Sequence, residues 1–288
     1  MGFGDELWTG PKRLVLAQNK GRLTLCHSSF RGVFPLLFTP PWALHADMHG
    51  HLSDQNAIVA ALERLSPTLA VIDLGPRAAS ELRTPRGWVE VFRHTRQLSI
   101  DPNSPTALPR HRLKQQRRFF REGGSVTVTK DQDEAWSNVL DLHQISRRRK
   151  ELASNGSRLE TLLGRISQAP WTFASVAHDA TGTAIASGGF VILEDQTCVY
   201  SFGGQQRSPG SGDASVAMLL AAIEYAREMG CTTFDFGGSQ DSGVDQFYSE
   251  FGAEVVLLRR WVKGPKWFPT LFPSTWKEWT SPTVHASS

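Results

Sequence analysis

Residues 197 to 252 decide the fold of this chain and read TCVYSFGGQQRSPGSGDASVAMLLAAIEYAREMGCTTFDFGGSQDSGVDQFYSEFG. The stretch opens with β-forming residues from Thr197 to Phe202, and a glycine-rich turn follows. Ala214 to Met229 then carries apolar residues at helical spacing, and Gly230 stands where a helix C-terminus prefers glycine. Thr232 to Phe236 is a second short β-like run. This order predicts a βαβ unit, with two parallel strands and a helix over one face of their sheet.

The turn before the helix carries the functional signal. It reads RSPGSGDA from Arg207 to Ala214. Gly210 and Gly212 can leave backbone N–H groups at the helix N-terminus pointing at an anion, and such a place suits a pyrophosphate. An ordinary surface turn with a serine or aspartate cap would carry the same residues, so the turn alone leaves both interpretations open.

The turn and its surroundings resemble one protein superfamily. The spacing Arg207-x-x-Gly210-x-Gly212 resembles the Q/R-x-x-G-x-G/A loop of GNAT acyltransferases, which in that family binds the pyrophosphate of acyl-coenzyme A. The segments YSFGGQQ, LLAAIEYAREMGCTTFDFGGS and GVDQFYSEFGAE resemble the C-terminal half of the FemAB-like branch, also called BioF2-like. FRHTRQLSID, RHRLKQQRRFFREGGSVTV and LHQISRRRKE are similar to the middle section of that branch, so the resemblance covers residues 90 to 260. It implies that acyl-coenzyme A is bound by Gln206, Arg207, Gly210, Ser211 and Gly212.

The resemblance also implies the fold class. It is α+β, with a GNAT-like mixed sheet flanked by helices, in a tandem of two GNAT-like halves of which the N-terminal one is degenerate. The N-terminal part fits this layout, because RLVLA, RLTLC and GVFPLL between residues 13 and 37 predict an antiparallel meander. A predicted helix over 54–65 and a predicted strand over 69–74 follow. We expect an N-terminal half at 1–105, an acyltransferase half at 106–260 and a Trp/Pro-rich tail at 261–288.

Catalysis in the GNAT superfamily works mainly by positioning and deprotonation, so the resemblance implies no Ser/His/Asp set. An amine would attack the thioester while backbone N–H groups from Tyr200 to Gly203 stabilise the oxyanion. Asp235, at the end of the second strand, is either the base or a structural carboxylate bonded to loop N–H groups. Tyr248 stands where the family commonly has lysine after a phenylalanine, and it either donates a proton or only packs. The predicted catalytic residues are Asp235, Tyr200 and Tyr248.

The N-terminal part offers a candidate for the acceptor side. His45, Asp47, His49 and His51 alternate, so an extended strand would place all four on one side, where they could bind Zn²⁺. Neighbouring prolines and a glycine within the run argue against a rigid strand. We therefore predict no metal, and a polar loop that lines the acceptor cleft with His45 and Asp47.

Residues 108 to 122 predict the most basic helix of the chain. Its positive stripe is formed by Lys114, Arg117, Arg118 and Arg121. Such a stripe is either a solvated face or a patch for the phosphates of coenzyme A, a nucleotide-linked sugar or tRNA. Arg117 and Arg118 are the predicted substrate-binding residues on this helix.

Composition agrees with these expectations without requiring them. The net charge of +3 does not by itself indicate nucleic acid, and no apolar run is suited to spanning a membrane. The three cysteines are scattered, which predicts reduced thiols in a cytoplasmic protein. The tail after Trp261 mixes tryptophan, proline and lysine. It favours a strap over the protein's own sheet, with a partner interface or peripheral membrane contact as the alternative.

Three functions follow from these motifs. The first is an N-acyltransferase that moves an acyl group from acyl-coenzyme A to an amine acceptor, such as an amino sugar or a cell-envelope precursor. The second, implied by the resemblance, is a FemAB-like transferase that takes an amino acid from tRNA to a peptidoglycan precursor. The third is a non-catalytic binding module with the same fold. The sequence does not identify the acceptor, because specificity lies in loops whose pairing the sequence leaves open.

Overall fold

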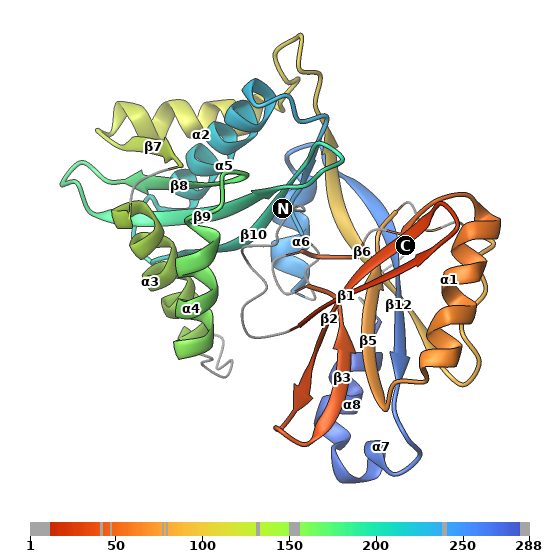
Figure 1. The fold of residues 1–288 in the computed structure, drawn as a ribbon. Coiled ribbons are helices and arrows are strands. Elements are labelled where there is room, and N and C mark those ends of the chain that lie inside the picture. Colours follow the sequence, from red (N-terminus) through yellow and green to blue (C-terminus); the bar gives the residue numbers. More distant parts are fainter. Residues whose placement is uncertain are drawn as a thin grey trace. The chain divides into compact units, whose positions relative to one another are not determined.

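The chain forms two compact units in the computed structural model, which describes residues 12–40, 43–46, 48–76, 78, 80–130, 133–149, 156–237 and 241–282. The central unit spans Arg96–Gly237 and Gly243–Glu254, and the flanking unit contains the described residues up to Thr95 and from Val255 onward. Each unit has a mixed β-sheet and covering helices (Figure 1). The predicted α+β class is confirmed.

The sheet of the central unit has the order β6-β11-β10-β9-β8-β7. Only β10 and β11 run parallel, and the helix α5 connects them as the βαβ pattern predicts. The strands are the end of β6 (Val89–Ser99), β7 (Ser125–Thr129), β8 (Thr172–His178), β9 (Ala184–Ile192), β10 (Thr197–Gln205) and β11 (Thr233–Asp235). The helices are α2 (Arg110–Arg121), α3 (Asp133–Arg149), α4 (Gly156–Ile166), α5 (Ser211–Glu228) and α6 (Ser242–Ser249).

Helices cover both faces of this sheet. Figure 1 shows α2 and α5 on one face of the strands β7 to β10, and α3 and α4 on the other. The core under α5 contains fully buried aromatic rings, and Phe173 stacks on Phe190 with 4.8 Å between ring centroids. Burial of one such ring contributes about 1.5–3 kcal/mol. The face of α5 that carries Val216, Leu219 and Ile223 is buried, as its helical spacing predicts.

Glycines in β9 and β10 let other groups approach the strands closely. A Cβ atom on Gly204 would lie 2.0 Å from the Leu142 carbonyl oxygen of α3, and one on Gly203 would lie 1.9 Å from the Tyr200 hydroxyl. The prediction that Gly203 and Gly204 end the strand is therefore wrong. Strand β10 continues to Gln205, because these two positions accept a helix and a ring rather than a turn.

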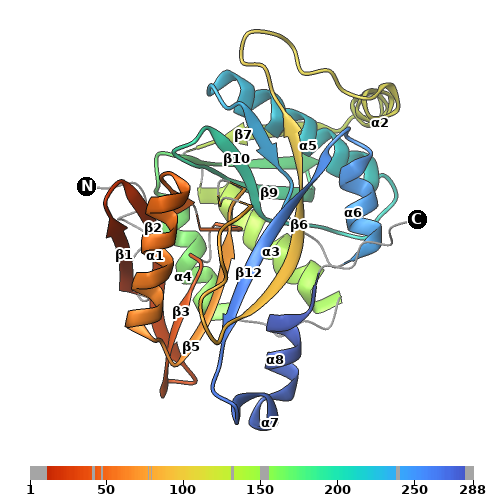
Figure 2. The same ribbon diagram turned by 90° about the vertical axis from the view of Figure 1, so that its right-hand side faces the viewer.

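The sheet of the flanking unit has the order β1-β2-β3-β5-β12-β6, with β4 beside β2. Its strands are β1 (Lys12–Gln18), β2 (Gly21–Phe30), β3 (Phe34–Phe38), β4 (Met48–His49), β5 (Leu69–Leu74), β12 (Glu254–Lys263) and the first part of β6. Helix α1 (Leu52–Leu65) lies against β1 and β2 (Figure 2). Residues Val89–Ser99 form one continuous strand, β6, and the described residues between Pro76 and Leu82 contain no helix.

The two units repeat one topology. In the flanking unit an antiparallel β1-β2-β3 meander is followed by α1 and by β5, which pairs parallel with β3. In the central unit β8-β9-β10 is followed by α5 and by β11, which pairs parallel with β10. A further antiparallel strand completes each set, β12 beside β5 and β6 beside β11. This repeat agrees with the tandem arrangement that the sequence predicts.

The tail forms two short helices, α7 (Phe268–Leu271) and α8 (Pro273–Thr280). Their rings pack on the β2–β3 hairpin of the same unit, where Phe30 contacts Phe268 and Trp279 at centroid distances of 5.5 Å and 5.8 Å. The tail is thus a strap over its own sheet. None of the helices in the described residues combines the length and apolar character needed to cross a membrane.

Candidate active site

The glycine loop, residues 206 to 210, joins the end of β10 to the start of α5 and is fixed at its stem. The Ser215 hydroxyl in the first turns of α5 donates to the Gln205 side chain at the end of β10. Gln206 donates its backbone N–H to the Ile185 carbonyl at 3.0 Å and its side-chain amide to the Ala184 carbonyl at 3.3 Å. The stem of the loop is therefore bonded to α5 through Gln205 and to β9 through Gln206.

The N-terminus of α5 is open. Gly210 is the N-cap, with φ of 81° and no side-chain cap, and its carbonyl accepts the first helical hydrogen bond, from Ala214. The backbone N–H groups of Gly212 and Asp213 have no acceptor among the described residues. A Cβ atom on Gly210 or Gly212 would meet nothing within 4 Å. Unpaired N–H groups, the positive end of the helix dipole and free space together make a place for an anion.

The corresponding helix of the flanking unit, α1, has a capped N-terminus. The Asp54 carboxylate accepts a hydrogen bond from the His51 backbone N–H at 3.2 Å, within a capping box. Among the described residues, the N-terminus of α5 has no such capping box.

This link contains the predicted acceptor-side residues. His45 is only 3 % exposed, and Asp47 lies outside the described residues. Among the described residues of this link, Met48 and His49 form a two-residue strand and His51 is the N-cap of α1, so no long strand carries the alternating residues on one face. Within the described part of the chain, no three His, Cys, Asp or Glu side chains gather as metal ligands. An acceptor-binding role for His45 and Asp47 stays a prediction.

The basic helix α2 contacts the start of α5 through an ion pair. The Arg118 guanidinium donates to the Asp213 carboxylate, with 2.6 Å between Nη2 and Oδ1, and Gln115 donates to the same oxygen at 3.1 Å. Asp213 is buried, whereas the Arg118 side chain is 50 % exposed. The pair neutralises the acidic residue in the first turn of α5. Arg117 and Arg121, on the same helix, are exposed to solvent.

A second arginine of α2 is structural. Arg112 is buried, pairs with Glu250 at 2.7 Å and lies over the rings of Phe247 and Phe251 at 4.5 Å and 4.7 Å. Burial is the largest cause that lowers the pKa of this guanidinium. The side chain ties α2 to α6, so the basic helix has a fixed position within the central unit.

The strands β10 and β11 diverge beside the glycine loop. Their parallel pairing ends at Val199 opposite Asp235, while β10 continues to Gln205 along β9. The register between β9 and β10 shifts between Tyr200 and Phe202, which marks a bulge. From Tyr200 onward one edge of β10 is therefore no longer paired with β11.

The predicted catalytic residues surround this divergence. The Tyr200 ring stacks on Phe190 at 5.2 Å, and burial raises the pKa of its hydroxyl far above the ordinary value, so the group stays protonated. Tyr248 of α6 packs on Tyr200 at 6.4 Å and on Phe236 at 5.2 Å. Asp235 is fully buried, and its carboxylate accepts hydrogen bonds from Gln97 and from the Gly237 N–H, both at 2.8 Å. These contacts are those of a carboxylate that holds a turn, and its role as base stays a prediction.

Two further residues lie at this edge of β10, and the motifs in the sequence did not indicate them. His143 and Ser146 of α3 contact the backbone of β10 at Gly203 and Gln205. They are three positions apart, on the helix that also carries the buried residues Val139 and Leu142. A histidine and a serine at that spacing were the signal available in the sequence.

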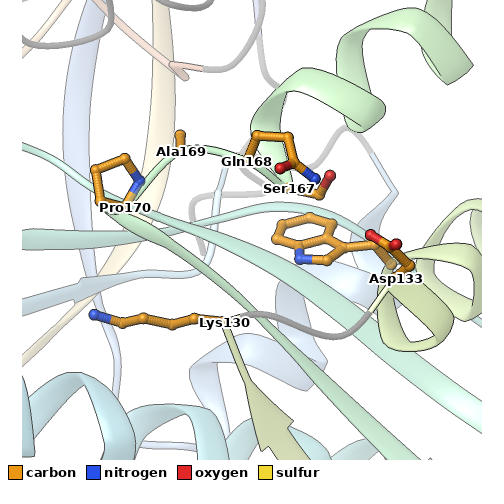
Figure 3. A pocket seen from close by; sticks show the side chains of 7 residues that line it. Lys130, Asp133, Ser167, Gln168, Ala169 and Pro170 are labelled. Carbon is orange, nitrogen blue, oxygen red and sulfur yellow. The ribbon is translucent and has the colours of Figure 1, made fainter.

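A separate pocket of about 470 Å³ lies between the start of α3 and the segment that joins α4 to β8 (Figure 3). The indole N–H of Trp136 is buried there without an acceptor in the described residues. None of the predicted site residues lies in this pocket. Its lining is Lys130, Asp133, Trp136, Ser167, Gln168, Ala169 and Pro170.

A protein-family model described as an acetyltransferase (GNAT) domain matches residues 109–254, half of the 288-residue chain. The chain belongs to the GNAT acetyltransferase family. The matched segment contains the basic helix, the glycine loop and the divergence of β10 from β11. Membership in this family supports a transferase.

Solved structures extend the likeness of this GNAT protein to both units. FemX aligns with a TM-score of 0.63 at 13% identity, over 88% of this chain and 89% of FemX. L-PGS from Bacillus licheniformis aligns with 0.62 at 10% identity, over 96% and 91%. A domain of a putative lysylphosphatidylglycerol synthetase from Agrobacterium fabrum aligns with 0.59 at 13% identity, over 92% and 89%. At these identities the shared property is the fold, which confirms the resemblance to the FemAB-like branch at that level. No curated protein matches this sequence.

Proposed function

We propose that this GNAT protein transfers an acyl group from acyl-coenzyme A to an amine. The observation that carries the proposal is the open N-terminus of α5, which lies directly after the unpaired edge of β10. The first feature suits a pyrophosphate, and the second suits the reacting carbonyl. One donor molecule that carries both groups can use both features at once.

Residues of the loop and of the first turn of α5 have different roles in binding the donor. The N–H groups of Gly212 and Asp213 receive the pyrophosphate, and Gly210 and Gly212 leave the space that it needs. Arg207, which is exposed within the loop, adds a positive charge. Gln206 and Ser211 shape the loop through their backbone hydrogen bonds to Ile185 and Ser208.

The edge of β10 supplies the chemistry. Backbone N–H groups between Tyr200 and Gly203 stabilise the negative charge that develops on the carbonyl oxygen, and fixed donors of this kind contribute about 3–4 kcal/mol each. The Tyr200 hydroxyl, protonated and next to Gly203, is a hydrogen-bond donor to the leaving group. Tyr248 holds the Tyr200 ring in place, and Asp235 fixes the turn after β11.

The acceptor in this proposal is an amine of an amino sugar or of a cell-envelope precursor. We place the reaction in the cytoplasm, because Cys26, Cys198 and Cys231 are free thiols.

A second donor is favoured by a different observation. The face of α2 with Arg117 and Arg121 is exposed, and both units share the fold of a putative lysylphosphatidylglycerol synthetase. An aminoacyl-tRNA would place its phosphates on the cations of α2 and its ester carbonyl at β10. The acceptor amine and the edge of β10 would keep the same roles.

Parallel assays distinguish the two donors. Purified protein is mixed with acetyl-coenzyme A or with aminoacyl-tRNA and a panel of 2-amino sugars, diamines and short peptides, and release of thiol or of amino acid is followed. The acyl-coenzyme A proposal expects amine-dependent thiol release and a rise in unfolding temperature with coenzyme A. Release of amino acid from aminoacyl-tRNA without any response to coenzyme A would support the second donor. No response to either donor would support a non-catalytic module.

The cations of α2 give a further prediction. Replacing Arg117 and Arg121 together by alanine should weaken coenzyme A binding only a few-fold, because each exposed ion pair contributes about 0–1 kcal/mol. If tRNA is the donor, its affinity should fall strongly and the slope of log K against log salt should decrease by about 2. Salt titrations of both ligands measure this. Lys266→Ala with Lys277→Ala, which removes two exposed charges from the tail, is the control. Unchanged binding of both ligands would show that the α2 face is only solvated.

A further inference from the structure

His143 of α3 lies at the unpaired edge of β10. Its Nδ1 atom is 3.0 Å from the Gly203 carbonyl oxygen and 3.4 Å from the Gly203 backbone nitrogen. The N–H and C=O groups of one strand residue point to the same edge, and β9 pairs along the other edge. The imidazole therefore lies on the side from which β11 has diverged, at the edge where the reacting carbonyl is placed.

The two contacts of Nδ1 correspond to two tautomers. Nδ1 either donates to the carbonyl oxygen or accepts from the N–H of Gly203, and the shorter distance assigns it as the donor to the carbonyl. In that tautomer Nε2 carries no proton, so it is a free acceptor. The Gly203 N–H is then also available to a developing oxyanion. One arrangement thus supplies a base and a hydrogen-bond donor at neighbouring positions.

We propose that His143 is the proton acceptor for the attacking amine. The inference rests on the proposed function in one respect, that an amine is acylated at β10, and it holds for either donor. The amine nitrogen bonds to the acyl carbon, and its proton passes to Nε2 of His143. The bond from carbon to sulfur, or to the ester oxygen, then breaks, and the imidazolium returns the proton to the leaving group. The products are an amide and a free thiol or hydroxyl, with the imidazole neutral again.

The surroundings of His143 suit a base. Burial lowers the pKa of the imidazole below its ordinary value of 6.5, against the opposing effect of the Gly203 hydrogen bond, and Arg147 lowers it further. The side chain is neutral at pH 7 as a result. From β10 the Tyr200 hydroxyl lies next to Gly203, and its raised pKa keeps it uncharged. Tyr200 therefore does not change charge between about pH 5 and 8.

Asp235 is less suited to this task than His143. Its carboxylate is fully buried and already accepts hydrogen bonds from Gln97 and Gly237. His143 is half-buried, so a substrate can reach the ring.

Three variants distinguish a catalytic base from a residue that only forms hydrogen bonds with the backbone of β10. His143→Asn keeps a polar side chain beside Gly203 but cannot take a proton, and His143→Ala removes both properties. Ser146→Ala is the matched control, because the Ser146 hydroxyl contacts the Gln205 backbone at 3.1 Å in the same way and does not titrate near neutral pH. We expect kcat/KM of the amine reaction to fall about a hundredfold or more in both His143 variants and to stay within a few-fold in Ser146→Ala.

The pH profile is a second readout. Wild-type kcat/KM, expressed per unprotonated amine, should fall as the pH is lowered through the pKa of His143, below 6.5, because only the neutral imidazole accepts a proton. This acidic limb should be absent in His143→Asn. Near wild-type activity in His143→Asn, with an unchanged acidic limb, would show that His143 only positions β10.

A third readout needs no substrate. Nitrogen chemical shifts of the ¹⁵N-labelled full-length protein at pH 7 should show Nδ1 of His143 protonated and Nε2 bare. A protonated Nε2 would overturn the inference, whatever the assays show. If the wild type transfers the acyl group and His143→Asn transfers it equally well, His143 is not the proton acceptor, while the proposed function stands. No transfer by the wild type from either donor rejects the proposed function, and the role of His143 with it.

Discussion

The variant Gly212→Val is expected to lose at least about tenfold in affinity for coenzyme A, equivalent to about 1.4 kcal/mol. The added side chain enters the free space at the N-terminus of α5, where the pyrophosphate is proposed to lie. The substitution should leave the fold intact, because a Cβ atom at residue 212 meets no protein atom within 4 Å and Gly212 does not have a positive φ. Valine is a better helix former than glycine by a few tenths of a kcal/mol, so stability should stay within about 0.5 kcal/mol.

Gly164→Val is the matched control for this experiment. Gly164 is an exposed helical glycine of α4 with nothing within 4 Å of its Cβ position, and it lies away from the glycine loop. Calorimetric titration should find its coenzyme A affinity unchanged. Arg207→Ala should weaken binding by less than Gly212→Val, because one exposed ion pair contributes about 0–1 kcal/mol. Equal affinities of Gly212→Val and Gly164→Val would remove the loop from the donor site.

Asp73→Ala should lower the free energy of unfolding of the flanking unit by about 3–5 kcal/mol. The Asp73 carboxylate binds the Arg260 guanidinium through two hydrogen bonds of 2.7 Å, and both side chains are only 13 % exposed. Arg93 lies close by, and burial followed by repulsion from Arg260 lowers the pKa of its guanidinium. Without the Asp73 carboxylate, the half-buried guanidinium groups of Arg93 and Arg260 would repel each other with less compensation.

Urea unfolding measures this effect against two references. Glu63→Ala breaks an ion pair with Arg83 at the surface of the same unit, which should cost less than about 1 kcal/mol. Asp73→Leu combined with Arg260→Met removes the pair as a whole and should regain most of the lost stability. A loss in Asp73→Ala no larger than that in Glu63→Ala would show that the pair is effectively solvated.

The sequence predicted the elements whose apolar pattern is local. The helix after the glycine loop, the strand at 69–74 and the N-terminal meander are present, because each has a local pattern of apolar residues. The glycine signal at Gly203 and Gly204 was misread, because a glycine that ends a strand and one that admits a helix look alike in one sequence. For Gly204, only the position of Leu142 on α3, far earlier in the sequence, distinguishes these two kinds of glycine.

The site shows the same limit. The loop from Arg207 to Gly212 could be predicted because a local spacing carries its chemistry. His143 could not, because its contact with Gly203 depends on how α3 crosses the sheet. The ion pair of Arg118 with Asp213 likewise joins residues 95 positions apart, so the sequence showed the charge of α2 but not its neutralisation. Contacts of this range arise from packing and leave no local pattern.

The most direct test of the account compares coenzyme A with pantetheine, which lacks the pyrophosphate, by calorimetric titration of the wild-type protein and of Gly212→Val. If the N-terminus of α5 binds the pyrophosphate, the wild type should bind coenzyme A at least about tenfold more tightly than pantetheine, and the difference should disappear in Gly212→Val. Equal affinities of the wild type for the two ligands, or a difference that survives in Gly212→Val, would contradict the account.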